Sequence, residues 1–313
     1  MTSIPVRRRP TAPDGLVVVD KPAGCTSHDV VARMRRLAGT RKVGHAGTLD
    51  PMATGVLVLG VGRATRLLTY VVGADKEYVA TIRLGSSTTT DDAEGEAVSH
   101  ADPSAVTRAA IDREVARLTG AIQQVPSSVS AIKIDGKRAY ARVRAGEDVQ
   151  LAARPVTVSE FVVNDVSAVE ARPGGVPALD VDVRVVCSSG TYIRALARDL
   201  GVALGVGGHL TVLRRTRVGG YALAAARTLD ELEAWPDDAP LEVLALADAA
   251  RATFPVREVT AVEATALSYG RPIEADPVIA SEPVAAVSPA GELVALLETS
   301  GGYARPVLVF APA

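Results

Sequence analysis

The sequence predicts a chain of about two domains that combines helices with β-sheet, and three observations lead to this class. Its 313 residues exceed the usual length of one small domain. Apolar residues make up 48% and charged residues 22%, which supplies a large core and excludes disorder as the main state. Short β-branched runs bounded by turn residues alternate with segments of helical period, so both kinds of element are expected.

The N-terminal part of the chain contains a regular succession of predicted elements. Residues 15–20 predict a buried strand, and residues 21–24 predict a turn. Ser27 is the expected N-cap of a helix whose apolar stripe runs from Val30 to Leu37 and ends before Gly39. An irregular loop is expected at 44–55, a buried strand at 56–60, a short helix at 64–71 and a strand at 78–84.

The rest of the chain alternates in the same way. Residues 86–95 are rich in Thr and Asp and predict a surface loop, and residues 103–118 have helical composition. Strands are expected at 156–163, 180–186 and 210–218, and a helix at 191–204 follows the turn at 188–190. The composition shifts at 235–240, and short strand-like runs with Gly and Pro turns fill 256–310. We therefore expect a domain boundary near residue 248.

Cysteine usage and hydropathy narrow the class of protein. The two cysteines, Cys25 and Cys187, lie far apart in sequence and form no metal-type spacing, so a zinc ribbon or a disulfide framework is excluded and a reducing cytoplasm fits. No apolar run approaches the roughly 20 residues that span a bilayer. The basic residues 7–9 lead into a polar stretch, so no apolar core of a signal peptide follows them.

The net charge of −2 conceals an asymmetry between the two ends of the chain. Residues 1–230 hold 30 basic and 23 acidic side chains, whereas residues 231–313 hold 4 basic and 13 acidic ones. A basic body suggests a polyanionic partner such as nucleic acid. Two solvated surfaces of opposite sign remain the simpler alternative.

The loop at 44–55 is the strongest candidate for chemistry. It is rich in glycine and threonine, lies between strongly patterned elements, and contains only two ionisable side chains, those of His45 and Asp50. Pro51 biases Asp50 toward an extended backbone, and Gly55 permits a sharp turn or the close approach of a ligand. Composition alone also allows a turn-forming Asp and a hydrogen-bonded surface His.

The motif GHAGTLDPMATGVL at 44–57 closely resembles the catalytic motif of the bacterial tRNA pseudouridine-55 synthases. Other motifs of that family appear in the family's order across roughly residues 15–220. They are VDKPAGCTS at 19–27, KEY at 76–78, VPS and SAIK within 122–140, SGTYIR at 189–194 and GHLTVLRR at 208–215. The chain is thus identified as similar to this family over most of its length.

The resemblance implies an α+β fold. A pseudouridine-synthase catalytic domain with a largely antiparallel mixed sheet is expected over residues 1–248, including a basic N-terminal arm at 1–14. A small PUA-like β-barrel domain is expected over residues 249–313, because residues 266–273 and 283–295 resemble such a module. The acidic charge of this region leaves open whether it binds RNA or only caps the catalytic domain.

The resemblance also implies the catalytic residues. Asp50 takes the position of the family's nucleophile, and Arg194 that of the cation that keeps it ionised and oriented. Tyr78 takes the position that stacks on the target base, and Tyr192 that of the second active-site tyrosine. Taken singly, these residues also fit core tyrosines and an arginine in a surface ion pair.

A second group of residues is implied to contact RNA. His45 matches the histidine that lies against the flipped nucleotide, Lys21 stands in the N-terminal motif, and Leu213 matches an apolar contact with the base. Arg66 matches a basic position near the RNA backbone. Other basic side chains are candidates for phosphate contacts, and about half of them are expected to touch RNA. These are Lys133, Lys137, Arg138, Arg142, Arg144, Arg214, Arg215 and Arg217.

The implied function is isomerisation of a uridine in the T loop of tRNA, at position 55 of the tRNA convention. The reaction involves no redox change and no net hydrolysis, so no metal and no organic cofactor are expected. The expected partner is the tRNA T stem-loop, with no membrane and no obligate protein partner. Attack at C1′ and attack at C6 remain open. So do two other classes of function, a tRNA-binding folding factor with dispensable catalysis and a nucleoside hydrolase.

Overall fold

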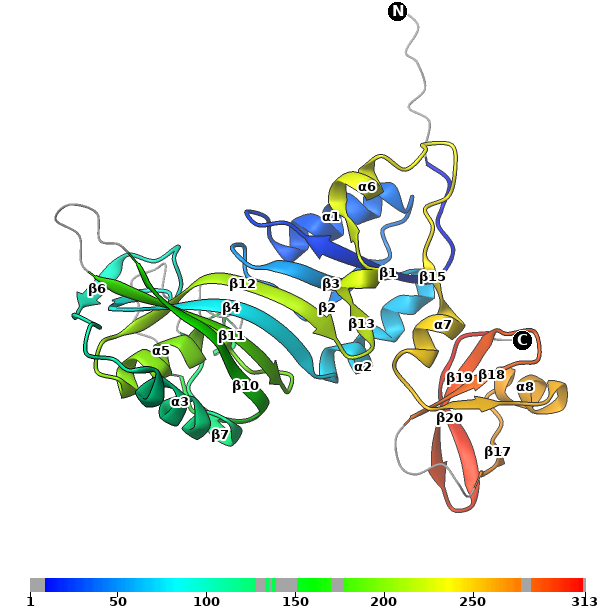
Figure 1. The fold of residues 1–313 in the computed structure, drawn as a ribbon. Coiled ribbons are helices and arrows are strands. Elements are labelled where there is room, and N and C mark those ends of the chain that lie inside the picture. The colour runs from blue at the N-terminus through cyan, green and yellow to red at the C-terminus, as the bar shows by residue number, and fades with distance from the viewer. Residues whose placement is uncertain are drawn as a thin grey trace, which may run out of the picture. The chain divides into compact units, whose positions relative to one another are not determined.

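A computed structural model describes residues 9–127, 133–134, 137–138, 151–169, 177–276 and 283–311. The chain divides into two compact units (Figure 1). The first unit comprises Met1–Pro51, Gly55–Val72 and Val218–Ala313, three segments that are separated in the sequence. The second unit comprises Met52–Thr54 and Gly73–Arg217.

The sheet of the first unit is built around β1 (Gly15–Lys21). Along one edge, β1 pairs antiparallel with β3 (Thr54–Val61), which also pairs with β2 (Val43–Ala46). Along the other edge, β1 pairs parallel with β14 (Arg227–Thr228) and antiparallel with β15 (Leu244–Ala245). Both long strands are buried along nearly their whole length, which is why their sequences read as continuous apolar runs.

The helices of the first unit are short, and their ends refine the sequence prediction. Helix α1 (Ser27–Leu37) buries the predicted stripe, but its N-cap is Thr26, whose side chain forms a capping box with Asp29. The expected helix at 64–71 is divided into the 3₁₀ helix η1 (Gly62–Arg66) and α2 (Leu68–Gly73). Helices α6 (Leu229–Glu233) and α7 (Leu246–Arg251) follow later in the chain. Within the described ranges, no helix has the length and apolar character needed to cross a membrane.

The C-terminal segment of this unit forms a curled five-stranded sheet (Figure 1). Its strand order is β16-β18-β19-β20-β17. The strands are β16 (Val256–Glu258), β17 (Ile273–Glu274), β18 (Val284–Val287), β19 (Leu293–Ser300) and β20 (Tyr303–Val309). Helix α8 (Ala261–Ser268) lies in a region where only strands were expected. Leu296 and Phe310 belong to one hydrophobic core with Leu16, Val58 and Leu67, so the last strands pack into the same core as the first ones.

The second unit contains a sheet with the order β12-β4-β11-β10-β7. Its strands are β4 (Lys76–Leu84), β7 (Gly120–Gln124), β10 (Arg154–Val169), β11 (Ala178–Cys187) and β12 (Gly208–Val218). The pairs β4–β11, β10–β11 and β7–β10 run antiparallel. Two small hairpins, β5 (Ser86–Thr88) with β6 (Ala97–His100) and β8 (Lys133–Ile134) with β9 (Lys137–Arg138), stand apart from this sheet.

Two helices pack beside each other on the sheet of the second unit (Figure 1). They are α3 (Arg108–Arg117) and α5 (Ile193–Ala203). Helix α5 buries Ile193, Leu196, Ala197 and Leu200, which the 3.6-residue period places on one face. This face fixes the helix against the sheet and thereby fixes the direction of its N-terminal turn.

Candidate active site

The loop that carries Asp50 is held in place by a buried lysine. Lys21, at the end of β1, is 0% exposed. Its ammonium donates hydrogen bonds to the carbonyl oxygens of Pro22 at 2.9 Å, Cys25 at 2.8 Å and Pro51 at 3.2 Å. Charge-assisted bonds of this kind are about twice as strong as neutral ones. Lys21 therefore braces the peptide after Asp50 from inside the protein, and the RNA contact expected of it stays a prediction.

Two further contacts hold the residues on either side of the half-buried Asp50. The backbone N–H of Gly24 donates to the Pro51 carbonyl at 2.9 Å. The Ser27 hydroxyl accepts from the Leu49 N–H at 2.9 Å and lies 3.2 Å from the Leu49 carbonyl oxygen, to which it donates. Ser27 was expected to cap α1, and instead it secures the loop. The carboxylate of Asp50 thus projects from a segment that is fixed at the residue before it and at the residue after it.

His45 lies on a strand and not in the irregular loop that the sequence predicted. It is part of β2 and stands opposite Leu59 of β3. The ring of His28, on the first turn of α1, contacts the His45 ring edge to face, with centroids 5.6 Å apart and planes at 78°. Gly55 has φ +101°, a conformation that favours glycine, but it lies inside β3, opposite Lys21 of β1, and not at the sharp turn that the sequence suggested.

The two tyrosines and Arg194 belong to the second unit. Tyr78 lies on β4 opposite Val185 of β11 and is largely buried. Tyr192 is the N-cap residue of α5, so Arg194 stands in the first turn of that helix, as predicted. The side-chain amide of Gln124 bonds to both backbone groups of Tyr192, accepting from its N–H at 2.8 Å and donating to its carbonyl at 3.1 Å.

Arg194 is a buried cation. Its guanidinium donates to the Thr90 carbonyl at 2.8 Å and lies 3.5 Å from a carboxylate oxygen of Asp92. The side chains of Arg194 and Asp92 are each only 4% exposed. Partnering with a carboxylate offsets part of the cost of burying the arginine charge. The expectation of a surface loop for the Thr- and Asp-rich segment is therefore wrong in one respect, because part of it folds inward around Arg194.

The neighbouring Asp91 holds this inward turn in place. Asp91 has φ +59°, a strained conformation for a residue with a side chain. Its carboxylate accepts from Ser127 at 2.7 Å and from Arg198 at 3.3 Å, and Arg198 also donates to the Val125 carbonyl at 2.7 Å. The Asp91 carbonyl accepts from the Leu210 N–H at 3.0 Å. These bonds fix the backbone from which Thr90 and Asp92 reach Arg194.

Several expected RNA-binding residues have defined surroundings. Arg66 donates to the Val309 carbonyl at 2.6 Å, and its guanidinium lies 5.3 Å from the Phe310 ring centroid, so it fastens the end of β20. Leu213 is buried on β12, whose Arg215 is also buried and whose Arg217 pairs with Asp75 at 2.7 Å. The backbones of Lys133, Lys137 and Arg138 form the β8–β9 hairpin, whereas Arg142 and Arg144 lie outside the described residues.

Two buried groups in the second unit have altered acidity. Burial, assisted by the nearby Arg215 charge, lowers the pKa of Lys76 to about 8. Burial raises the pKa of the Cys187 thiol to about 11. Among the described residues, no three His, Cys, Asp or Glu side chains are grouped so as to hold a metal ion.

Comparison with known proteins identifies the family. The TruB family pseudouridylate synthase N-terminal domain matches residues 35–193. The tRNA pseudouridine synthase B of Arthrobacter sp. (strain FB24) is 66% identical over 305 residues, which cover 95% of this chain and 97% of the relative. The chain belongs to the TruB family. The synthase is thus an isomerase of the tRNA pseudouridine synthase class, and the tRNA pseudouridine synthase B of Paenarthrobacter aurescens (strain TC1) is 61% identical with 95% coverage of both chains.

Solved structures and the C-terminal families agree with this membership. An H/ACA RNP bound to a substrate RNA containing 2′-deoxyuridine contains a chain with TM-score 0.66 and 25% identity, covering 95% of the synthase and 85% of that chain. A Cbf5-Nop10-Gar1 complex gives TM-score 0.65 and 27% identity at the same coverage. C-terminal domain families of the tRNA pseudouridine synthases match residues 194–247 and 254–311. The predicted α+β fold, with a largely antiparallel mixed sheet and a PUA-like C-terminal module, is confirmed, whereas the boundary at residue 248 stays a prediction.

Sequence reasoning missed the residues that hold the catalytic candidates. Asp92 and Thr90 lie in a polar segment, and polarity alone indicates solvent, so their inward turn gave no signal. Gln124 is the last residue of the short strand β7, and an amide at a strand end is usually interpreted as a surface residue. The strained Asp91 also gave no signal, because Asp adopts a positive φ only occasionally.

Proposed function

We propose that the synthase converts uridine to pseudouridine at position 55, in the T loop of tRNA. Two kinds of observation support this substrate. The relatives are named tRNA pseudouridine synthase B, and a structural relative belongs to an RNP that is bound to a substrate RNA. The sequence motifs resemble those of the pseudouridine-55 synthases. The observation that carries the catalytic part of the proposal is the braced Asp50 segment, in which the buried Lys21 ammonium and the Ser27 hydroxyl hold the residues on either side of the carboxylate.

We propose Asp50 as the nucleophile. The reaction breaks the N1–C1′ glycosidic bond, turns the uracil, and joins its C5 to C1′, while the C5 proton is lost to solvent and N1 gains one. A carboxylate can take C1′ in the interval, as in retaining glycoside hydrolysis, or add to C6 of the base. Neither route needs an oxidant or a Lewis acid, so we expect activity to survive exhaustive chelation.

The other candidates receive separate roles in this proposal. Tyr78 stacks on the extruded uracil, since an aromatic face holds a base without requiring a fixed hydrogen-bond pattern. Arg194 supplies a positive charge whose position is fixed by Asp92 and Thr90. Tyr192, two residues before Arg194, is the second tyrosine of the active site. His45 and Leu213 contact the flipped nucleotide, because extrusion leaves a gap that protein groups must fill.

The contacts with the tRNA backbone are assigned to the basic body of the chain. We propose Lys133, Lys137 and Arg138 as phosphate-binding residues, in a catalytic domain of residues 1–248 that is followed by the PUA-like domain. Each neutralised phosphate releases counterions, so affinity falls linearly with salt on a logarithmic plot. Replacing the three together should flatten that slope, and an unchanged slope would contradict the assignment. The reducing cytoplasm is the expected compartment, consistent with the free Cys25 and Cys187.

The decisive experiment measures tritium release from tRNA labelled at uracil C5 and maps the modified nucleotide. Wild-type protein should release tritium and modify position 55. Asp50→Asn should abolish release while tRNA affinity stays within about threefold, because the amide keeps the shape but not the anionic nucleophile. Substantial turnover by Asp50→Asn, with deamidation excluded, would refute the assignment of the nucleophile. Modification elsewhere in the tRNA would refute the proposed position.

A further inference from the structure

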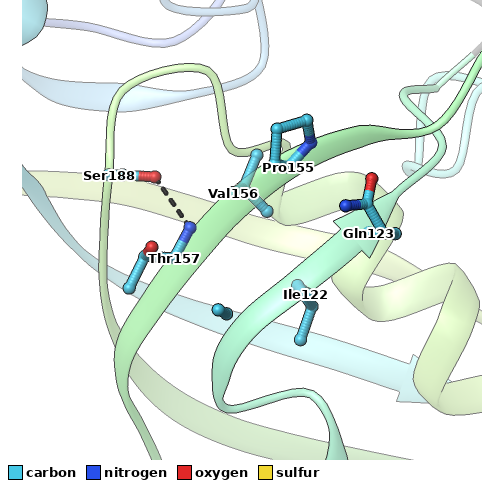
Figure 2. A pocket seen from close by; sticks show the side chains of 7 residues that line it. Ile122, Gln123, Pro155, Val156, Thr157 and Ser188 are labelled. Carbon is cyan, nitrogen blue, oxygen red and sulfur yellow. Dashed lines mark hydrogen bonds between the residues drawn. The ribbon is translucent and has the colours of Figure 1, made fainter.

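The connection between β11 and α5 is fastened to the sheet at both of its ends. At its start, the Ser188 N–H donates to the Thr157 carbonyl at 2.8 Å, and the Ser188 hydroxyl accepts from the Thr157 N–H at 2.9 Å (Figure 2). At its end, Gln124 bonds to the backbone of Tyr192. Thr157 lies on β10 and Gln124 on β7, which are paired strands. The short connecting segment from Ser188 to Tyr192 is thus held between two fixed points.

Gln124 is well suited to be the second fixed point. Its side chain is 1% exposed, and it is held on β7 opposite Arg154 of β10. The Tyr192 N–H donates to the Gln124 amide oxygen, and the Tyr192 carbonyl accepts both from the Leu196 N–H at 3.2 Å, the first bond of α5, and from the Gln124 amide N–H. One planar amide thus binds both backbone groups of the N-cap residue. Tyrosine at an N-cap cannot provide the short side-chain oxygen that usually orders a helix start. The Gln124 amide therefore takes over the ordering of this backbone.

We propose that Gln124 is a positioning residue for catalysis, which sets the place of Tyr192 and of the first turn of α5. Arg194 follows two residues later, and its guanidinium must meet the Thr90 carbonyl and the Asp92 carboxylate at 2.8 and 3.5 Å. A displacement of the helix start is passed on to that guanidinium, because the intervening backbone is already helical. The inference rests on the proposed catalytic roles of Tyr192 and Arg194.

The chain offers a matched control on the same strand. Gln123 is the neighbour of Gln124, but alternation along a strand directs it to the other face, and it is exposed. It lines a hollow with Ile122, Pro155 and Val156 near Ser188 (Figure 2). Replacing Gln123 changes the same residue type in the same strand without touching Tyr192. Any effect of the strand itself should therefore be equal in the two variants.

The first comparison uses Gln124→Met and Gln123→Met. We expect Gln124→Met to lower the single-turnover rate at saturating enzyme by about 10- to 100-fold, since small misplacements of catalytic groups have effects of this size. Its tRNA dissociation constant should stay within about threefold of the wild-type value. Gln123→Met should keep both quantities near wild type. A saturating rate within about twofold of wild type for Gln124→Met would overturn the inference.

A second variant gives a readout that a purely structural role would not change. Gln124→Glu keeps the size and the acceptor for the Tyr192 N–H, but an ionised carboxyl has no proton to donate to the Tyr192 carbonyl. Protonation restores that donor, and burial raises the pKa of such a carboxyl. The rate of Gln124→Glu, divided by the wild-type rate at each pH, should rise severalfold as the pH falls from about 8.5 to about 6. A flat ratio would overturn the inference even if Gln124→Met failed to fold.

Failure of the inference and failure of the proposed function are distinguishable in the same assay. If wild-type protein releases no tritium from tRNA, the proposed function is wrong. If Arg194→Lys keeps the wild-type rate, the role of Arg194 is wrong, and with it the inference. If Arg194→Lys is inactive but Gln124→Met is fully active, the catalytic assignment stands and the positioning role of Gln124 is refuted.

Discussion

Replacing Lys21 by methionine tests whether the buried ammonium holds the Asp50 segment. Methionine retains most of the apolar stem and removes three charge-assisted bonds, to the carbonyls of Pro22, Cys25 and Pro51. Hydrogen bonds to charged groups contribute about 1.5–3 kcal/mol each. This loss of stability is offset in part. Burying the Lys21 ammonium costs several kcal/mol, and the methionine variant does not have this cost. The Pro51 carbonyl also keeps its bond from the Gly24 N–H.

The net effect should be a decrease of about 2–4 kcal/mol in the free energy of unfolding, and thus a thermal midpoint lower by about 5–15 °C. Loosening of the Asp50 segment should also lower the single-turnover rate by about 10- to 100-fold at temperatures where the variant is folded. Denaturant titration, thermal melting and tritium release measure these effects. Lys42→Met, at an exposed lysine, is the control. If Lys21→Met matched this control in stability and rate, the bracing role would be refuted.

Three other perturbations have defined outcomes. Above pH 8 folded Lys76 loses its proton while the unfolded chain keeps one, so the free energy of unfolding should rise by up to about 1 kcal/mol from pH 8 to 9. Above pH 9 the free energy of unfolding should level off, because the Cys187 thiol ionises in the unfolded chain but not in the folded protein. Denaturant titrations of Lys76→Met should not show the increase between pH 8 and 9. Asp92→Asn removes the buried counter-charge of Arg194 and should lower the single-turnover rate by about 10-fold or more, with tRNA affinity retained. Arg66→Ala should lower the free energy of unfolding by about 1–2 kcal/mol through loss of the Val309 bond, whereas a main effect on the salt dependence of tRNA binding would favour an RNA contact.

Elements with a strong repeating pattern could be predicted from the sequence. The apolar stripe of α1 and the apolar runs of β1 and β3 appear where expected. A helix with one buried face has apolar residues at a 3.6-residue period, and a strand buried on both faces has a continuous apolar run. The motif resemblance then placed Arg194 in the first turn of a helix, where the structure has it.

Elements fixed by tertiary contacts could not be predicted. Strand β2 has only four residues, and one of them is glycine, so the sequence contains no pattern that predicts its pairing with β3. His45 was therefore expected in a loop. Ser27 ranks slightly above Thr26 as an N-cap residue, but Asp29 completes a capping box with Thr26, and the Ser27 hydroxyl bonds to Leu49 instead. The roles of Gln124 and Asp92 depend on residues about 70 and 100 positions away, which no local pattern encodes.

The core shared by the first and last strands has a consequence for synthesis on the ribosome. Leu16, Val58 and Leu67 are made before Gly73–Arg217 of the second unit, whereas Leu296 and Phe310 of the same core are made only after it. Translation adds roughly 5–20 residues per second, so the nascent N-terminal strands wait on the order of ten seconds or more for these partners. Apolar surface that lacks its partner is what chaperones and proteases recognise. A chain that ends before β19 cannot complete this core, so truncated products should be removed by the cell instead of accumulating beside the full-length synthase.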